Sequence, residues 1–168
     1  MAGMIGAVWG IAGLSILFCS ALLRLYPYTM ELSNMTLTMS HWAALAASLL
    51  FMGYMEGYKG FHCRFSPRAA ARALYLKHHP TPLRILFAPL FCMGFFHAPR
   101  RRKIAAYSLT TMIIILIILI RLFPQPWRGI VDAGVLLGLG WGVITVWYFS
   151  LRAFFGKNFS VSPETPEE

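Results

Sequence analysis

The chain has 168 residues, of which 58% are hydrophobic and 12% are charged, and its mean hydropathy is +0.61. Soluble domains carry about 25% charged residues, so this composition excludes an ordinary soluble domain and indicates a single helical bundle in lipid. The formal net charge of +9 lies beside apolar segments, where the positive-inside rule explains it; nucleic acid is therefore not an expected partner.

Four apolar segments have the length of a membrane span, which takes about 20 residues within a range of about 17–25. The first has no positively charged region before it, so we expect a permanent anchor and not a cleaved signal peptide. The third is almost entirely isoleucine and leucine and lacks a face of small residues, so it is expected to contact lipid most. The predicted spans are residues 2–23, 42–58, 104–120 and 130–151.

Two further segments lie between the second and third spans. Ser66 and Pro67 suit the cap and first turn of a short helix, predicted over residues 67–79, with a stripe of basic and aromatic residues that would lie on the cytoplasmic membrane surface. Residues 85–99 are apolar but short, which is typical of an interfacial or re-entrant segment. Residues 158–168 form an acidic tail that is expected to be disordered.

The basic residues predict the orientation. Ten of the fifteen lie between Lys59 and Lys103, and a fifth span at 85–99 would split them between the two sides and weaken the positive-inside bias. We therefore predict an all-α integral membrane protein with four transmembrane helices, a short cytoplasmic interfacial helix and a re-entrant or interfacial segment. Residues 1–157 would form a single bundle in a bacterial inner membrane, with the N- and C-termini in the cytoplasm.

Glycines repeat every three or four positions on three of the spans. This spacing places small residues on one helix face, where close approach of two backbones gives packing that lipid cannot supply. A tight bundle explains the pattern, and an interface with a second copy or another subunit is the alternative. The predicted packing residues are Gly6, Gly10, Gly53, Gly57, Gly134, Gly138 and Gly142.

Two acidic residues lie within the predicted spans. Glu56 lies at the edge of a glycine face, and an ionisable residue at membrane depth indicates a functional site. The alternative is an ion pair with Lys59, because neighbours three positions apart face one another on an α-helix. Asp132 lies one turn into the last span with Arg128 four residues before it, which predicts a structural ion pair.

The sequence from Glu56 to Arg72 concentrates an acid, a histidine, a thiol and four basic residues. Arginines at a bilayer surface form bidentate bonds with phosphate oxygens, and lipid headgroups are the nearest phosphates. The alternative is that these basic residues only determine the topology, for which their charge is enough and no particular geometry is needed. The candidate functional cluster is Glu56, Lys59, His62, Arg64, Arg68 and Arg72.

The sequence contains no motif for catalysis, metal binding or cofactor binding. Its five histidines lack metal-site spacing such as HExxH, and a haem held by His62 and His97 would need both on facing spans. Its three cysteines show no CxxC pair, and no glycine motif for nucleotides or hydrolases is present. We therefore predict no catalytic residue, metal site or cofactor.

Three functions remain open from the sequence. The leading one is a non-enzymatic accessory or scaffold subunit that contacts anionic lipid or an acidic partner through its basic cytoplasmic loop. One alternative is a small transporter or channel subunit that uses Glu56. The other is a membrane enzyme acting on a phosphorylated lipid, with Arg64, Arg68 and Arg72 holding phosphate and Glu56 or His62 as acid and base. Expected partners are membrane lipid, another membrane protein subunit or a second copy.

Overall fold

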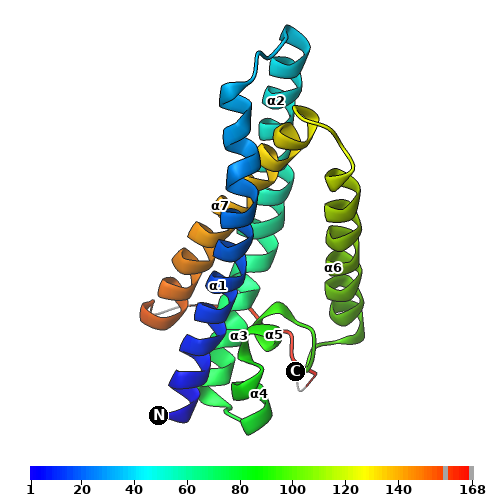
Figure 1. Ribbon diagram of the computed structural model, residues 1–168. Coiled ribbons are helices and arrows are strands. Elements are labelled where there is room, and N and C mark those ends of the chain that lie inside the picture. Colours follow the sequence, from blue (N-terminus) through cyan, green and yellow to red (C-terminus); the bar gives the residue numbers. More distant parts are fainter. Residues whose placement is uncertain (157–158, 167–168) are drawn as a thin grey trace.

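The computed structural model describes residues 1–156 and 159–166, and the regular structure within these ranges is entirely helical. The long helices run roughly along one axis, and the two short helices that lie between α3 and α6 in the sequence, α4 and α5, are found at one end (Figure 1). We call this end, where α3 finishes and α6 begins, the basic end. The elements are α1 (Ala2–Glu31), η1 (Leu32–Asn34), α2 (Met39–Met52), η2 (Gly53–Phe65), α3 (Ser66–His78), α4 (Pro82–Leu86), α5 (Ala88–Met93), α6 (Arg100–Arg121) and α7 (Trp127–Phe155).

Three helices in the described part of the chain are long and apolar enough to cross a membrane. They are α1 together with η1 (Ala2–Asn34), α6 and α7, and they support the predicted integral membrane protein. The predicted span 42–58 is not among them. Only 14 residues, Met39–Met52, form regular α-helix there, and the chain continues as a π-helix that contains Glu56 and Lys59.

The elements α2, η2 and α3 form one uninterrupted helical rod. Gly53, Phe65 and Ser66 at the junctions all have right-handed helical dihedral angles, and the rod is roughly 60 Å long at about 1.5 Å per residue. Pro67 therefore does not begin a separate helix. A proline ring collides with the carbonyl four residues before it in an α-helix, and the wider π turns that precede Pro67 offer that carbonyl more room.

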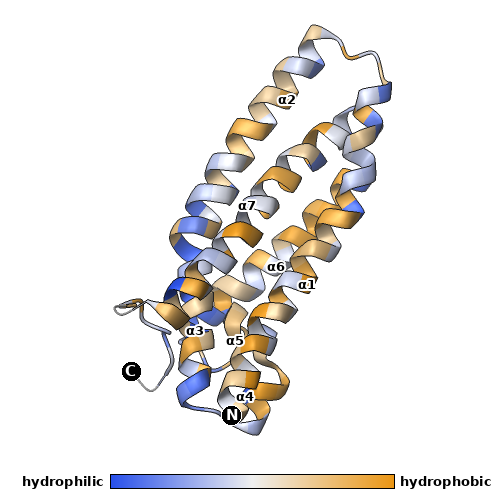
Figure 2. Cartoon of the chain, turned by 90° about the vertical axis from the view of Figure 1, so that its left-hand side faces the viewer, coloured by the Kyte–Doolittle hydropathy of each residue, from blue (hydrophilic) through white to orange (hydrophobic). Residues whose placement is uncertain are grey.

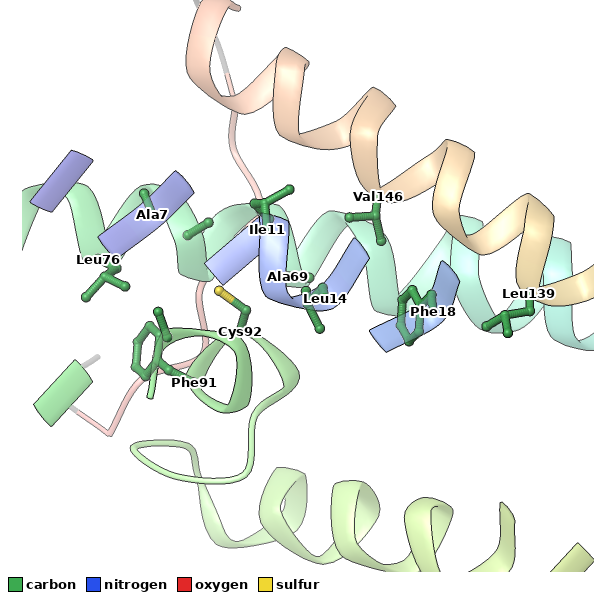
Figure 3. Close-up of a cluster of buried hydrophobic side chains, with 12 residues drawn as sticks. Ala7, Ile11, Leu14, Phe18, Ala69, Leu76, Phe91, Cys92, Leu139 and Val146 are labelled. Carbon is green, nitrogen blue, oxygen red and sulfur yellow. The ribbon is translucent and has the colours of Figure 1, made fainter. Parts of the chain in front are cut away.

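The predicted interfacial helix over residues 67–79 is not confirmed, because α3 belongs to the core. Ala70, Ala73 and Leu76 are all 0% exposed, and α3 packs against α1, α5 and α7. The alanines beside Arg68 and Arg72 on α3 allow this packing, because their small side chains let neighbouring helices approach. Figure 3 shows α1, α3, α5 and α7 each contributing side chains to this cluster.

Residues 85–99 stay at the basic end and do not run along the bundle (Figure 1). They form the end of α4, the short helix α5 and a turn at Gly94, whose φ of 88° is in the left-handed region that favours glycine. α5 packs against α1, where a methyl group added at Gly10 would lie 2.8 Å from Sγ of Cys92. The segment thus fills the space beside the beginning of α1.

The other predicted packing glycines lie at helix contacts. A methyl group added at Gly6 would lie 3.0 Å from Ile85, one at Gly53 3.3 Å from Leu137, and one at Gly57 3.2 Å from Cβ of Trp141. On α7, the same addition would lie 2.9 Å from Met52 at Gly134, 2.9 Å from Glu56 at Gly138 and 2.7 Å from Phe61 at Gly142. These glycines bring α1 onto α4 and α5, and α7 onto the long rod.

α6 stands apart from the other long helices (Figure 1). Ile120, near its end, is the single buried residue among its 22, so α6 leaves most of its surface uncovered by its own chain; the expectation that this span contacts lipid most stays a prediction. Hydrophobic residues cover much of α1, α6 and α7, whereas hydrophilic residues gather on the lower part of the long rod (Figure 2).

Candidate functional site

A cavity of about 140 Å³ lies at the basic end. Its walls come from the junction of η2 and α3, the turn that follows α5, the first turns of α6 and residues 163 and 164. Three arginines from two helices line it, and Glu164 is the single acidic residue among the residues that form its walls. We call it the arginine cavity. It is lined by Phe65, Arg68, Arg72, Cys92, Met93, Gly94, Phe95, Arg102, Ala105, Ala106, Leu109, Thr110, Pro163 and Glu164.

Arg72 holds the walls of the cavity together. It is 4% exposed, and its guanidinium donates to five backbone carbonyls. Nε donates to Phe91 at 2.6 Å, and Nη2 donates to Phe96 and His97, both at 2.9 Å. Nη1 donates to Pro163 at 3.0 Å and to Glu164 at 3.3 Å.

The electrostatic setting of Arg72 keeps it charged. Burial lowers the pKa of its guanidinium to about 10, which still leaves it protonated at neutral pH. Its Cζ also lies 4.3 Å from the centre of the Phe91 ring, at cation–π distance. All three of its nitrogens are occupied by carbonyls, so with residues 163 and 164 in place Arg72 supplies charge and rigidity but no spare hydrogen-bond donor.

Arg102 pairs with Glu164 at the mouth of the cavity. Nη2 of Arg102 donates to Oε1 of Glu164 at 2.8 Å, and Nε forms an ion pair with Oε2. The two oxygens thus meet the two nitrogens in the parallel arrangement that arginine forms with carboxylates and phosphates. The side chains are 45% and 30% exposed, so water and solutes reach the pair.

Arg68 has two terminal nitrogens that stay unused in the part of the chain that the structure describes. Its Nε donates to the Arg64 carbonyl at 2.5 Å, and within the described ranges its two terminal nitrogens have no hydrogen-bond partner. It is half-buried, and that burial, together with the charge of Arg102, lowers the pKa of its guanidinium. An arginine in this setting gains from an anion that neutralises it.

The structure places the six predicted cluster residues in four different surroundings. Arg68 and Arg72 line the arginine cavity, whereas Lys59 and Arg64 are exposed. Glu56 lies against Gly138 of α7. His62 stacks on Tyr58, with ring centres 5.5 Å apart, and meets the edge of Phe149 at 5.3 Å.

The alternative ion pair between Glu56 and Lys59 does not form within the described ranges. A π-helix bonds each residue to the fifth one along, and its wider turn takes neighbours three apart off a common face. Neither Glu56 nor His62 lines the arginine cavity. The enzyme hypothesis therefore finds no acid–base pair beside the arginines among the described residues, and the transporter hypothesis finds Glu56 packed against a helix.

Sequence reasoning missed two members of the site, Arg102 and Glu164. Arg102 lies in a run of four basic residues that was interpreted only as a topology signal. One signal for the tail was available: three of the six acidic residues in the chain are its last three glutamates, at positions 164, 167 and 168. Positions 158, 167 and 168 of the predicted tail, and position 157 just before it, lie outside the described residues.

The arrangement is suited to binding an oxyanion. A metal site would need other residues, and among the residues that the structure describes no group of three or more His, Cys, Asp and Glu side chains lies close enough to hold a metal ion. The chain matches no protein-family model, no curated protein and no solved structure. Its function therefore has to be argued from the geometry of the arginine cavity.

Proposed function

We propose that this chain is a four-span inner-membrane protein, with both termini in the cytoplasm, that binds the phosphate of an anionic lipid headgroup in the arginine cavity. It would act as a non-enzymatic accessory or scaffold subunit. The observation that carries the proposal is the meeting of Arg68, Arg72 and Arg102 around one small cavity with a single acidic residue in its walls.

The chemistry of these arginines favours phosphate. A guanidinium offers parallel N–H groups that match two phosphate oxygens, and Arg68 has both terminal nitrogens unused within the described ranges. Arg102 is engaged by a carboxylate, and this contact supports the proposal that an oxyanion binds here. The buried charge of Arg72 adds attraction at close range, where a low dielectric screens it little.

The apolar part of the cavity favours a lipid over a free phosphate. Ala105, Ala106 and Leu109 of α6 form one wall, and α6 continues from there as an exposed apolar helix. A cavity of about 140 Å³ is smaller than the roughly 300–1,000 Å³ that encloses a drug-sized ligand. It suits a headgroup phosphate whose acyl chains lie outside it, along α6.

The fourth span is supported by the way the long rod packs on α7. Ser48 Oγ donates to the Ile130 carbonyl at 3.0 Å, and the hydroxyls of Ser66 and Thr145 lie 2.8 Å apart. The rod from 48 to 66 thus runs parallel to α7 from 130 to 145. If α7 crosses the bilayer, this part of the rod crosses beside it, and the positive-inside rule then places the basic end in the cytoplasm.

Native mass spectrometry of the full chain, released from membranes that contain phosphatidylglycerol and phosphatidylcholine, tests the lipid site. We expect Arg68→Ala and Arg102→Ala to lower the amount of retained phosphatidylglycerol by about tenfold each, since one charge-assisted phosphate contact is worth about 1.5–3 kcal/mol. Arg101→Ala is the matched control, because it removes the same charge from an exposed neighbour outside the cavity. Equal retention by all three variants and the parent would overturn the proposal.

A further inference from the structure

We infer that the C-terminal tail is an internal ligand of the arginine cavity, with the Glu164 carboxylate in the place of the headgroup phosphate. Tail and lipid would then exclude one another, and the lipid site would open only when the tail leaves. The inference rests on the proposed lipid site, and it adds a control that the lipid site alone does not require.

Glu164 binds arginine in the same way as a phosphate does. Its two oxygens engage two nitrogens of Arg102, as two phosphate oxygens do in a bidentate arginine pair. Glu164 and Pro163 also form part of the cavity wall. A headgroup phosphate bound to Arg102 would need the position that the carboxylate holds.

The tail also occupies one nitrogen of Arg72. Its Nη1 donates to the carbonyls of Pro163 and Glu164, whereas its other two nitrogens donate to carbonyls of α5 and the turn after it. Departure of the tail therefore frees one nitrogen of Arg72 and leaves the rest of its bonds in place. It also frees Nε and Nη2 of Arg102, so that Arg68, Arg72 and Arg102 can all donate to an incoming oxyanion.

The tail is held in a specific conformation. Thr165 is 2% exposed although it lies three residues from the end of the chain, and the amide of Glu164 donates to Ser162 Oγ at 3.1 Å. Glu164 has a φ of 49°, which is uncommon for a residue other than glycine. Docking contacts must offset this unfavourable backbone conformation, so loss of the Arg102 pair should release the tail.

The distribution of charge gives the tail a reason to dock here. Half of the six acidic residues are in the last five positions, and ten of the fifteen basic residues lie between Lys59 and Lys103. Such a pair of oppositely charged segments attracts before contact, and the attraction falls with salt. An anionic membrane surface offers the same basic residues many competing charges.

Hydrogen-exchange mass spectrometry of the full chain tests the inference through residues 159–166. We expect Glu164→Gln to speed exchange in this peptide in detergent and to raise phosphatidylglycerol retention several-fold. Phosphatidylglycerol nanodiscs should speed the same exchange in the parent protein, whereas phosphatidylcholine nanodiscs should not. Glu31→Gln is the charge-matched control at the opposite end, where Glu31 accepts from Gln125.

The outcomes separate the two proposals. If Arg68→Ala and Arg102→Ala lower lipid retention while Glu164→Gln changes neither exchange nor retention, the tail inference is wrong and the lipid site stands. If Glu164→Gln releases the tail but no arginine variant alters lipid retention, the lipid site itself is wrong, and the exchange between tail and lipid fails with it.

Discussion

The guanidinium carbon of Arg128 lies 3.5 Å from the centre of the Tyr28 ring, and Nε of the same residue lies 3.7 Å from Oδ2 of Asp132. Arg128 thus joins α1 to α7 at the end of the bundle opposite the arginine cavity. The ion pair with Asp132 confirms the prediction from their spacing of four residues. The contact with Tyr28 lay beyond the sequence, because it joins residues a hundred positions apart.

Loss of Arg128 is expected to destabilise the protein more than neutralisation of Asp132. Arg128→Met leaves the Asp132 carboxylate, which is 4% exposed, without its cation, and breaking a buried pair in this way costs about 3–5 kcal/mol. Asp132→Asn keeps the side-chain volume and leaves Arg128, whose side chain is 21% exposed, on the Tyr28 ring, so we expect a smaller loss of about 1–2 kcal/mol. Apparent Tm values in detergent measure the difference, and equal losses would contradict this view of the pair.

Two glycines of α7 give a matched test of helix packing. An added methyl group at Gly134 would lie 2.9 Å from Cγ of Met52 and 3.0 Å from the Ser48 carbonyl, whereas nothing lies within 4 Å of one at Gly140. Gly134→Ala should therefore lower the apparent Tm, with a cost of about 1–3 kcal/mol from overpacking. Gly140→Ala should be neutral or stabilising, by up to about 1 kcal/mol, since alanine favours the helix. The reverse order would show that α7 does not pack through this face.

Replacement of Arg72 by lysine should fail to preserve the fold of the basic end. Lysine keeps the charge but has one nitrogen, and it cannot reach the five carbonyls that the planar guanidinium serves from three nitrogens. Each buried carbonyl left without a donor costs about 1–3 kcal/mol. We expect a markedly lower apparent Tm and faster hydrogen exchange in residues 91–97. Unchanged values for Arg72→Lys would disprove the view that the five hydrogen bonds of Arg72 hold this end of the protein together.

The proposed topology predicts the sidedness of Cys63. This thiol is exposed, whereas Cys92 is buried, and four spans with the basic end inside place Cys63 at the cytoplasmic end of the part of the rod that crosses the bilayer. An impermeant maleimide should label it in inside-out vesicles and leave it unlabelled in intact cells. Cys63→Ser is the control that identifies the labelled residue. Labelling of Cys63 from outside intact cells would reverse the orientation.

Properties that depend on local sequence were predicted well, and properties that depend on packing were not. The length and apolarity of α1, α6 and α7 and the pairing of Arg128 with Asp132 follow from neighbouring residues. The continuation of α2 and η2 into α3 did not, because Ser66 and Pro67 are typical of a helix start, and only the structure, in which α3 packs against α1 and α7, shows that the rod continues. Of the candidate site, Arg68 and Arg72 were identified, but Arg102 and Glu164 join them through tertiary contacts alone.

The isolation of α6 has a consequence for how the protein is made. The rod and α7 each carry a carboxylate, Glu56 against Gly138 of α7 and Asp132 paired with Arg128 on its own helix, whereas α6 has no charged residue between Lys103 and Arg121. Its most apolar stretch has a mean hydropathy of 2.3 and no buried residue. The free energy that moves α6 from the translocon into lipid must therefore come from its own apolar residues and not from packing on another helix. A charged residue substituted at the centre of α6 would raise the free energy of this transfer by about 2.5–3.5 kcal/mol, before the bundle has formed.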